Sequence, residues 1–355
     1  MAVYTTIDDP SAYFKVSLHT GNNTNDHAIT FDDTDTTMQP DLVWIKSRYN
    51  TEEHMITDSV RPINNYLASN NTDAEDVDSD NMQSLDSNGF TMGVRGTHNA
   101  NTIKYVAWCW KMGTTSGISG TGNLTVNGYS FNSTAKQSVI VYTGNGGSSG
   151  TYTHGLGSAP GFIFGKNRDE AGDGWFAYHH KNTSAPETDY LVPNTTAVTA
   201  DSDGYWNDVA PTSTLVTVGS AGEVNRAEQQ VAYCFAEVQG YSKIGTYTGN
   251  GNADGTFVYT GFRPAFTIIK DSGNSADWVM HSKGMNDSNP MLQSLEANGT
   301  ASQYTTAGKN IDYLSNGFKC RGTDTAVNGS GRNFVYIAFA EAPFVNSNGV
   351  PSTAR

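Results

Sequence analysis

Cysteine is rare in this sequence of 355 residues, which has only Cys109, Cys234 and Cys320. An odd and sparse set of cysteines does not indicate a disulfide framework, and a buried free thiol is the simplest expectation for each. No stretch approaches the ~18 consecutive apolar residues of a membrane-spanning helix. Long windows rich in Leu, Ala, Glu and Lys are also missing, which excludes a helical bundle or a coiled coil.

Basic residues are scarce relative to acidic ones. The chain has 21 Lys and Arg against 35 Asp and Glu, a net charge of -14. Residues 1–111 contain 16 acidic and 7 basic residues, so -9 of this charge lies in the first third. An acidic surface repels a phosphate backbone, so nucleic acid is not expected as a partner. The first residues, MAVYTT, have neither the basic nor the apolar region of a signal peptide.

What the sequence does contain is a threefold internal repeat. The triplet Thr-Gly-Asn occurs three times, at 20–22, 143–145 and 248–250. About twenty residues after each copy comes an apolar run that starts with proline and ends in lysine, at 40–46 (PDLVWIK), 160–166 (PGFIFGK) and 264–270 (PAFTIIK). The next strand opens at His54, Trp175 or Trp278. Apolar closing strands follow, at 106–110 (VAWCW), 231–235 (VAYCF) and 336–340 (YIAFA).

The local pattern is that of β-structure. Short runs rich in Val, Ile, Tyr, Phe, Trp and Thr alternate with Gly, Asn and Asp, and no helical pattern exceeds two turns. The sequence therefore predicts an all-β protein of three tandem antiparallel β-sandwich repeats, jelly-roll-like and about 105 residues each. The closing strands are apolar on both faces, which suits a central strand that is covered on both sides.

The predicted domain boundaries follow the repeats. Repeat 1 spans 1–112 with a short N-terminal arm, a Gly/Ser/Thr linker spans 113–128, repeat 2 spans 129–239, repeat 3 spans 240–343, and a C-terminal arm spans 344–355. The loose linker would let repeat 1 move. The short junction at 237–241 predicts that repeats 2 and 3 form one rigid block.

Four runs of the sequence are distinctive: 40–46 followed by 58–61 (DSVR), 105–111 (YVAWCWK), 206–213 (WNDVAPTS), and 240–243 (GYSK) through 247–251 (YTGNG) to 260–266 (TGFRPAF). Together they resemble a repeat-domain family of virion proteins from marine tailed bacteriophages. The family is usually left as a domain of unknown function or described as a tail-fibre or concanavalin/laminin-G-like jelly-roll domain. The resemblance covers residues from about 13 to 344. It carries over no catalytic residues, and Pro62 stands where relatives usually have glycine.

The resemblance implies a non-enzymatic virion surface protein, made in the host cytoplasm without a signal peptide. The leading expectation is a tail fibre, spike or tip component that contacts a glycan or protein receptor on the host surface. The alternative is a capsid decoration or cement protein, and a polysaccharide-degrading enzyme ranks below both. Expected partners are other virion proteins of the tail or capsid and the host receptor, and the protein is expected to form a homo-oligomer without inserting into a membrane.

Candidate sites come from departures from the repeat pattern. Trp206 breaks the pattern and precedes Asn207 and Asp208, which makes these three residues the candidate ligand-binding site. Asp76, Asp78 and Asp80 alternate as oxygen ligands of a structural Ca²⁺ could, although the glutamate that ends an EF-hand loop is missing. Residues 146–150 (GGSSG) match a hydrolase G-x-S-x-G motif, but a hairpin tip is the favoured interpretation. The nine Asn-x-Ser/Thr sequons are attributed to composition.

Overall fold

The computed structural model describes residues 5–32, 36–305 and 307–353, so the outermost residues of both predicted arms lie outside the described ranges. The all-β prediction is confirmed, since antiparallel strands form nearly all of the regular structure. The α-helices in the described ranges are single turns: α1 Gly96–Asn99, α2 Asp203–Trp206, α3 Gly222–Asn225 and α4 Thr325–Asn328. None of the described helices has the length or apolar character needed to cross a membrane.

Repeat 1 pairs a four-stranded sheet with a three-stranded sheet. The large sheet has the order β1 (Phe14–Thr20), β9 (Lys104–Trp110), β3 (Leu42–Ser47) and β4 (Met55–Asp58). The small sheet has the order β2 (His27–Thr30), β8 (Gly89–Met92) and β7 (Met82–Asp86). A 3-10 turn, η1 (Pro10–Ala12), precedes β1, and a short ribbon joins β5 (Asn65–Tyr66) to β6 (Asp76–Val77).

Repeat 2 has a five-stranded large sheet. Its order is β10 (Thr125–Asn132), β11 (Gln137–Thr143), β18 (Gln229–Phe235), β13 (Phe162–Asn167) and β14 (Phe176–His179). Two-stranded pairs are formed by β12 (Gly150–Thr153) with β17 (Leu215–Val218) and by β15 (Asp189–Tyr190) with β16 (Ala200–Asp201), and η2 (Pro186–Thr188) lies before β15. Because β10 begins at Thr125, the end of the predicted linker is part of this sheet.

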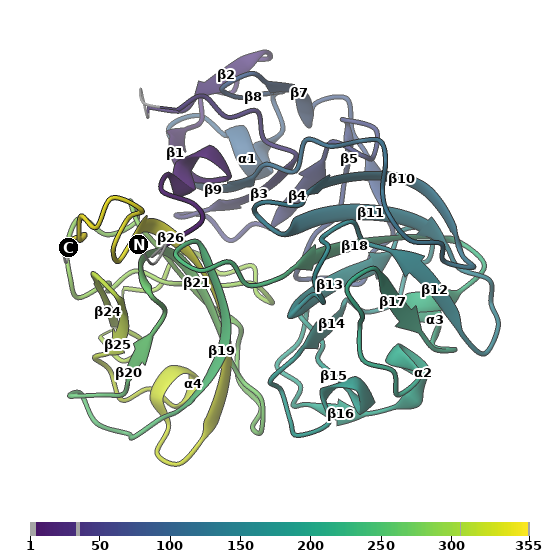
Figure 1. Ribbon diagram of the computed structural model, residues 1–355. Coiled ribbons are helices and arrows are strands. Elements are labelled where there is room, and N and C mark those ends of the chain that lie inside the picture. Colours follow the sequence, from purple (N-terminus) through teal and green to yellow (C-terminus); the bar gives the residue numbers. More distant parts are fainter. Residues whose placement is uncertain (1–4, 33–35, 306, 354–355) are drawn as a thin grey trace.

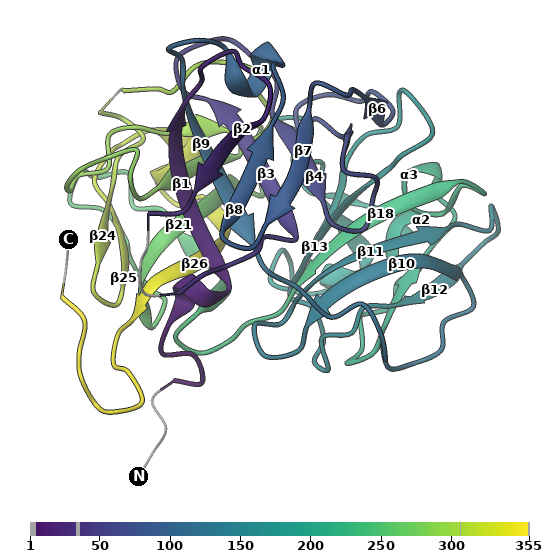
Figure 2. The same ribbon diagram turned by 90° about the horizontal axis from the view of Figure 1, so that it is seen from above.

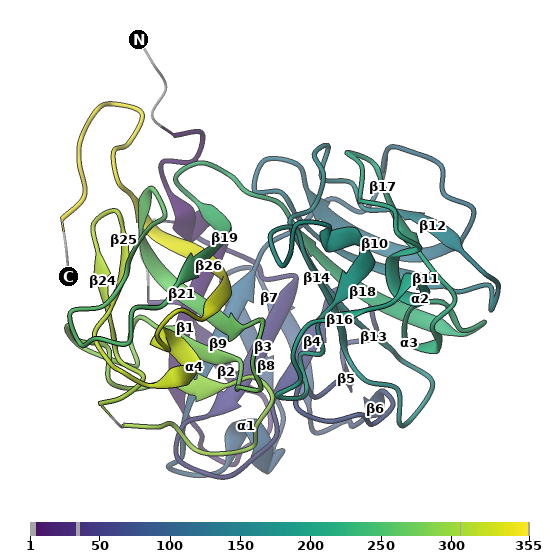
Figure 3. The same ribbon diagram turned by 90° about the horizontal axis from the view of Figure 1, so that it is seen from below.

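Repeat 3 again combines a large and a small sheet. The large sheet has the order β19 (Ser242–Thr248), β26 (Asn333–Pro343), β21 (Phe262–Asp271), β22 (Val279–Ser282) and β23 (Leu295–Glu296). The small sheet has the order β20 (Phe257–Tyr259), β25 (Gly317–Cys320) and β24 (Ile311–Leu314). The C-terminal arm lies beside the N-terminal segment, where Ser347 N donates to Asp8 Oδ1 at 2.7 Å (Figure 3).

One strand order recurs in the three large sheets: first strand, closing strand, proline-to-lysine strand, next strand. It appears as β1-β9-β3-β4, β11-β18-β13-β14 and β19-β26-β21-β22. The three repeats are arranged around a common centre (Figures 1 and 2). One face of each large sheet packs on its own small sheet and the other face packs in this centre, so the closing strands are buried on both faces.

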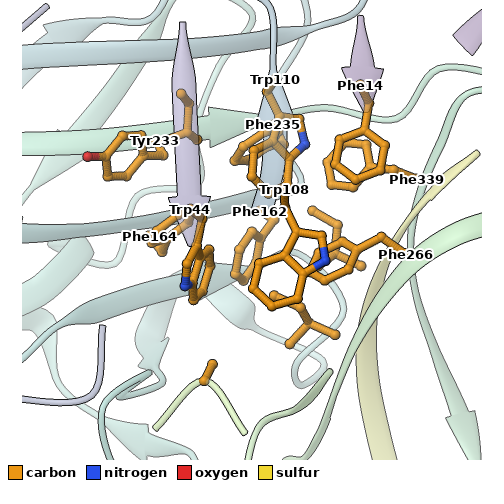
Figure 4. Packing of buried hydrophobic residues seen from close by; sticks show 14 of the residues in the cluster. Phe14, Trp44, Trp108, Trp110, Phe162, Phe164, Tyr233, Phe235, Phe266 and Phe339 are labelled. Atoms are coloured by element: carbon orange, nitrogen blue, oxygen red, sulfur yellow. The ribbon is translucent and has the colours of Figure 1, made fainter. Parts of the chain in front are cut away.

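The central core is built from aromatic rings of all three repeats (Figure 4). Ring centroids lie 5.2 Å apart for Trp108 and Phe266, 6.1 Å for Trp110 and Phe235, and 5.5 Å for Phe235 and Phe339. Repeat 1 therefore packs against both other repeats. The expectation that the linker lets repeat 1 move as a separate body is wrong, because burial of these rings outweighs the looseness of the connection.

Buried lysines at the ends of the three proline-to-lysine strands link the repeats in a closed cycle. Each is fully buried, and each Nζ donates to the carbonyl of a threonine in a neighbouring repeat. The pairs are Lys166 to Thr72 (3.3 Å), Lys270 to Thr196 (3.2 Å) and Lys46 to Thr300 (3.0 Å). Repeat 1 thus contacts repeat 2, repeat 2 contacts repeat 3, and repeat 3 returns to repeat 1, which is how a heterologous interface closes a threefold ring.

Indole and imidazole groups follow the same cycle. Side-chain N–H groups of one repeat face carbonyls of the preceding one: Trp175 Nε1 to Ala68 (2.8 Å), Trp278 Nε1 to Val192 (3.2 Å) and His54 Nε2 to Glu296 (3.0 Å). Within each repeat, the backbone N–H of that residue donates to an asparagine Oδ1, on Asn194, Asn298 or Asn70. Each of these asparagines stands two residues before the threonine that receives the lysine.

Candidate functional site

An exposed aromatic pair lies on β20, an edge strand of the small sheet in repeat 3. Phe257 and Tyr259 are 44% and 59% exposed, whereas Val258 between them is buried. Side chains two residues apart on a strand leave the same face, so both rings point outward together. Large aromatic side chains usually bury most of their surface, and an exposed pair on one face is therefore a candidate contact surface.

The equivalent strands of the other repeats carry small residues at these positions. The strand pairing shows which positions are equivalent, because Val258 pairs with Phe318 in repeat 3 as Ile29 pairs with Phe90 in repeat 1. The positions flanking the buried residue are occupied by Ala28 and Thr30 in β2, both exposed, and by Thr151 and Thr153 in β12, of which Thr153 is buried. Only repeat 3 presents aromatic rings there, so the feature is not required by the fold.

The neighbouring strand β25 has a side chain beside the ring of Phe257 but none beside the ring of Tyr259. Tyr259 lies opposite Gly317, which has no side chain, while Phe257 lies opposite Lys319. A Cβ at Gly317 would come within 2.0 Å of the Val258 carbonyl, so glycine is required for the close approach of the strands. Lys319 forms an ion pair with Asp254 at the edge of this face. The surface thus combines apolar rings with charged neighbours.

A groove of about 410 Å³ adjoins the aromatic pair and includes Tyr259 in its wall. The other lining residues come from the junction before β19 and its start, the turn after β20 and the C-terminal arm: Glu237, Gln239, Ser242, Lys243, Thr260, Gly261, Phe344 and Val345. Phe344 and Tyr259 supply apolar surface, and the remaining side chains are mainly polar. This volume and mixture are in the range of small-ligand sites.

Glu237 and Lys243 form the charged part of the groove. Lys243 Nζ lies 2.6 Å from Glu237 Oε2, and His180 Nε2 lies 3.7 Å from Oε1. Burial raises the pKa of the Glu237 carboxyl, but hydrogen bonds from His180 and Lys243 outweigh it and lower the pKa to about 2. Glu237 is therefore an ionised acceptor at neutral pH. It is the single carboxylate among the described lining residues, whereas glycoside hydrolysis uses two.

A family model described as a domain of unknown function, DUF7483, matches residues 9–343. The chain belongs to the DUF7483 family. The match runs from the start of η1 to the end of β26, so the family unit comprises all three repeats and not one of them. No curated protein matches the chain.

In this DUF7483 chain, the prediction that Trp206 is an exposed ligand-binding residue is wrong. Its side chain is fully buried, with its ring centroid 5.5 Å from that of Tyr178, and its Nε1 donates to the Asp189 carbonyl at 3.0 Å. The cause is local, since α2 ends at Trp206 and turns the ring into the core of repeat 2. Asn207 and Asp208 are exposed and have φ angles of 53°, so they form the turn that leaves the helix.

Asp76, Asp78 and Asp80 do not form the predicted calcium site in this structure. Asp76 accepts from the Tyr66 hydroxyl, Asp78 pairs with Arg95, and the backbone N–H of Asp80 donates to Asp78 Oδ1 at 2.8 Å. Within the described ranges, no group of three or more His, Cys, Asp or Glu side chains is arranged to hold a metal ion. The alternation of acids in sequence did not translate into convergence in space.

Residues 146–150 are not the tip of a hairpin as predicted, because they connect β11 to β12, which lie in different sheets and do not pair with each other. Gly146 has φ of 63°, and Gly150 begins the strand β12. A hydrolase nucleophile elbow instead leads from a strand into a helix.

Two sets of residues were missed by sequence reasoning, although a signal for each was present. Aligning 27–30, 150–153 and 257–259 shows that aromatic residues replace Ala and Thr only in the third strand. Likewise, the sequons at Asn70, Asn194 and Asn298 recur at one position of each repeat. Their recurrence reflects the structural asparagine and threonine of each interface, and composition alone does not explain it.

Proposed function

We propose that this protein is a non-enzymatic surface protein of a bacteriophage virion, a tail fibre, spike or tip component that contacts a host-surface glycan or protein. The resemblance of its repeat sequences to virion proteins supports the assignment to a virion. The observation that carries the contact function is the exposed pair Phe257 and Tyr259 beside a polar groove. Rings of this kind bind the apolar faces of sugars or of protein side chains, and the nearby polar groups orient the partner.

The interlocked core supports the same proposal. A protein on a particle surface functions outside cells, where stability must come from its own packing. Here the described cysteines are buried free thiols, and buried lysine, indole and asparagine contacts join the three repeats. A rigid support of this kind reduces the entropy lost when an exposed loop or strand engages a receptor.

The first test is the copy number per virion, measured by quantitative densitometry of purified particles against the major capsid protein. A few to a few dozen copies are expected for a tail component. Hundreds of copies would contradict placement in the tail.

The contact surface is tested by binding of purified, labelled protein to host cells. Phe257→Ala/Tyr259→Ala should weaken binding at least about tenfold, because the aromatic contacts are lost. Thr30→Ala, at the equivalent outward position of repeat 1, is the matched control and should bind as the unchanged protein does. Unchanged binding by the double variant, with an unchanged unfolding transition, would refute this surface as the contact site.

A capsid decoration or cement protein is the second candidate, and one observation favours it. The closed cycle of inter-repeat contacts gives a single chain approximate threefold symmetry, which fits a threefold position on a head lattice. This candidate requires hundreds of copies per particle and binding of the purified protein to empty heads. Binding to host cells without binding to heads would exclude it.

A further inference from the structure

The three inter-repeat interfaces share one backbone hydrogen bond beyond the lysine and indole contacts. In each, an N–H a few residues after the interface threonine donates to the carbonyl two residues after the buried lysine. The bonds are Glu75 N to Arg168 O (2.7 Å), Thr199 N to Ser272 O (2.9 Å) and Gln303 N to Arg48 O (2.8 Å). The backbone frame is therefore the same at all three interfaces, and the side chains at these positions can be compared directly.

Two of these interfaces are filled by an arginine. Between repeats 1 and 2, Arg168 binds the Glu75 carboxylate through Nε (2.9 Å) and Nη2 (2.6 Å). Between repeats 3 and 1, Arg48 Nε donates to Gln303 Oε1 at 2.8 Å.

Between repeats 2 and 3 the same positions hold Ser272 and Thr199, whose short side chains do not meet. A groove of about 770 Å³ opens at this place. It is the position where the other two interfaces have an arginine and its acceptor.

The lining of this groove is polar and has a charge opposite to that of the chain. It consists of Asn182, Thr183, Val198, Thr199, Ser272, Gly273, Asn274, Ser330, Gly331, Arg332 and Asn333. None of these described lining residues is acidic, although the chain as a whole has a net charge of -14. Arg332 carries the formal charge among the described lining residues, and because its partner Asp271 is buried, the guanidinium is the charged group that a ligand in the groove would meet.

Arg332 is held in place with part of its guanidinium unused. Its Nη1 donates to Asp271 Oδ2 at 3.1 Å, and its Nε and Nη2 have no acceptor among the described residues. The side chain crosses Gly329, where a Cβ would come within 2.4 Å of its Cδ. These two contacts orient the fork, and its side chain is 30% exposed.

We propose that the groove between repeats 2 and 3 binds a carboxylate-bearing saccharide. Its carboxylate pairs with Nε and Nη2 of Arg332, the same two atoms that Arg168 uses on Glu75 at the equivalent interface. Its hydroxyls bond to the amide and hydroxyl groups of Asn182, Thr183 and Asn274. This site does not depend on Phe257 and Tyr259, so it is separable from the contact surface proposed above.

The test is calorimetric titration of the full chain with trigalacturonate, with neutral maltotriose as the control sugar and inorganic phosphate as a second anion. Trigalacturonate should bind at least tenfold more tightly than either control, and salt should weaken its binding. Equal binding of the two sugars, or preference for phosphate, would overturn the proposal.

Two variants locate the site. Arg332→Lys keeps the charge beside Asp271 but loses the planar fork, and should weaken trigalacturonate binding at least tenfold. Thr199→Glu/Ser272→Arg rebuilds the pair seen between repeats 1 and 2, and should abolish binding without lowering the thermal unfolding midpoint. Phe257→Ala/Tyr259→Ala should leave the titration unchanged. If Arg332→Lys binds trigalacturonate as tightly as the unchanged protein, the proposal fails, whatever the stability of the Thr199→Glu/Ser272→Arg variant.

Discussion

The interface between repeats 1 and 2 and the interface between repeats 2 and 3 share a frame but differ in what fills it. Both have a buried lysine bonded to a threonine carbonyl and an indole N–H bonded to the preceding repeat. The first interface adds a cluster of buried charges, whereas the second has short polar side chains and a groove. The frame therefore determines assembly of the ring, and the side chains around it determine whether an interface is sealed or open.

Arg61 is the centre of the sealed interface. It follows β4 by three residues, its side chain is fully buried, and its Nε and Nη1 lie 2.7 Å from Asp58 Oδ2 and Glu75 Oε2. The Tyr233 hydroxyl of repeat 2 donates to Asp58 at 2.8 Å. Burial raises the pKa of Glu75, but hydrogen bonding by Arg168 and the charge of Arg61 outweigh it and lower the pKa to about 2. Each charge in this cluster depends on the others for compensation.

The largest effect is expected from Arg61→Met. Removing the guanidinium leaves Asp58 and Glu75 buried without their common partner, which should lower the free energy of unfolding by about 3–5 kcal/mol. The measurement is equilibrium unfolding in guanidinium chloride. Asn182→Ala, three residues after β14 at the open interface, is the matched control and should cost less than about 1 kcal/mol. Equal losses for the two variants would show that the charge cluster is not what distinguishes the interfaces.

A smaller difference is expected between Trp175→Phe and Trp278→Phe. Both remove an indole N–H bond between repeats and about the same ring volume. The Ala68 carbonyl accepts from Trp175 alone among the described groups, whereas the Val192 carbonyl also accepts from Thr195 N at 3.2 Å. Trp175→Phe should therefore be the more destabilising by about 1 kcal/mol, because it leaves a buried acceptor unpaired.

The same unfolding experiment measures this difference. A larger loss for Trp278→Phe would contradict the role assigned to the unpaired carbonyl. An equal loss would mean that packing of the rings, and not hydrogen bonding, decides both values.

Much of the fold could be predicted from the sequence, because the strand patterns recur in each repeat and the position of Trp175 follows that of Lys166 at nearly the same spacing as its counterparts do in the other two repeats. The strand 231–235 is apolar on both faces, which predicted cover on both sides. This pattern did not reveal that the second face of the strand is covered by the other two repeats. That arrangement depends on contacts between residues far apart in the chain, such as Trp108 with Phe266, and local patterns do not encode them.

The sites were predicted less well, for a related reason. Trp206 departs from the repeat pattern as a binding residue would, yet a single helical turn buries it, and the sequence does not distinguish an inward from an outward departure. Phe257 and Tyr259 carried a usable signal, since strand alternation fixes their direction once Val258 is placed inside. The groove between repeats 2 and 3 could not be foreseen, because it results from residues of four separate segments.

The smallest difference between the two interfaces is expected in what they share, the buried lysine, whose contribution to stability depends on pH. Burial lowers the pKa of Lys166 and of Lys270 from 10.5 to about 8, partly opposed by Asp173 and Asp271 respectively. The unfolded chain then holds a lysine proton that the folded chain has released, so each lysine makes stability increase as pH rises from about 8 to about 10.5. Buried thiols act in the opposite direction, since burial raises the pKa of Cys234 to about 12.

The lysine contribution is therefore isolated by subtraction. The unfolding free energy of the unchanged protein minus that of Lys166→Met should increase by up to about 1.4 kcal/mol per pH unit between pH 8 and pH 9.5, because the thiol contributions cancel. Lys270→Met should give the same slope, since the open and the sealed interface hold their lysines alike. A flat difference for either variant would mean that its lysine keeps an ordinary pKa. Unequal slopes would show that the charge cluster around Arg61 extends to the shared frame, and the comparison of the two interfaces would have to be redrawn at that lysine.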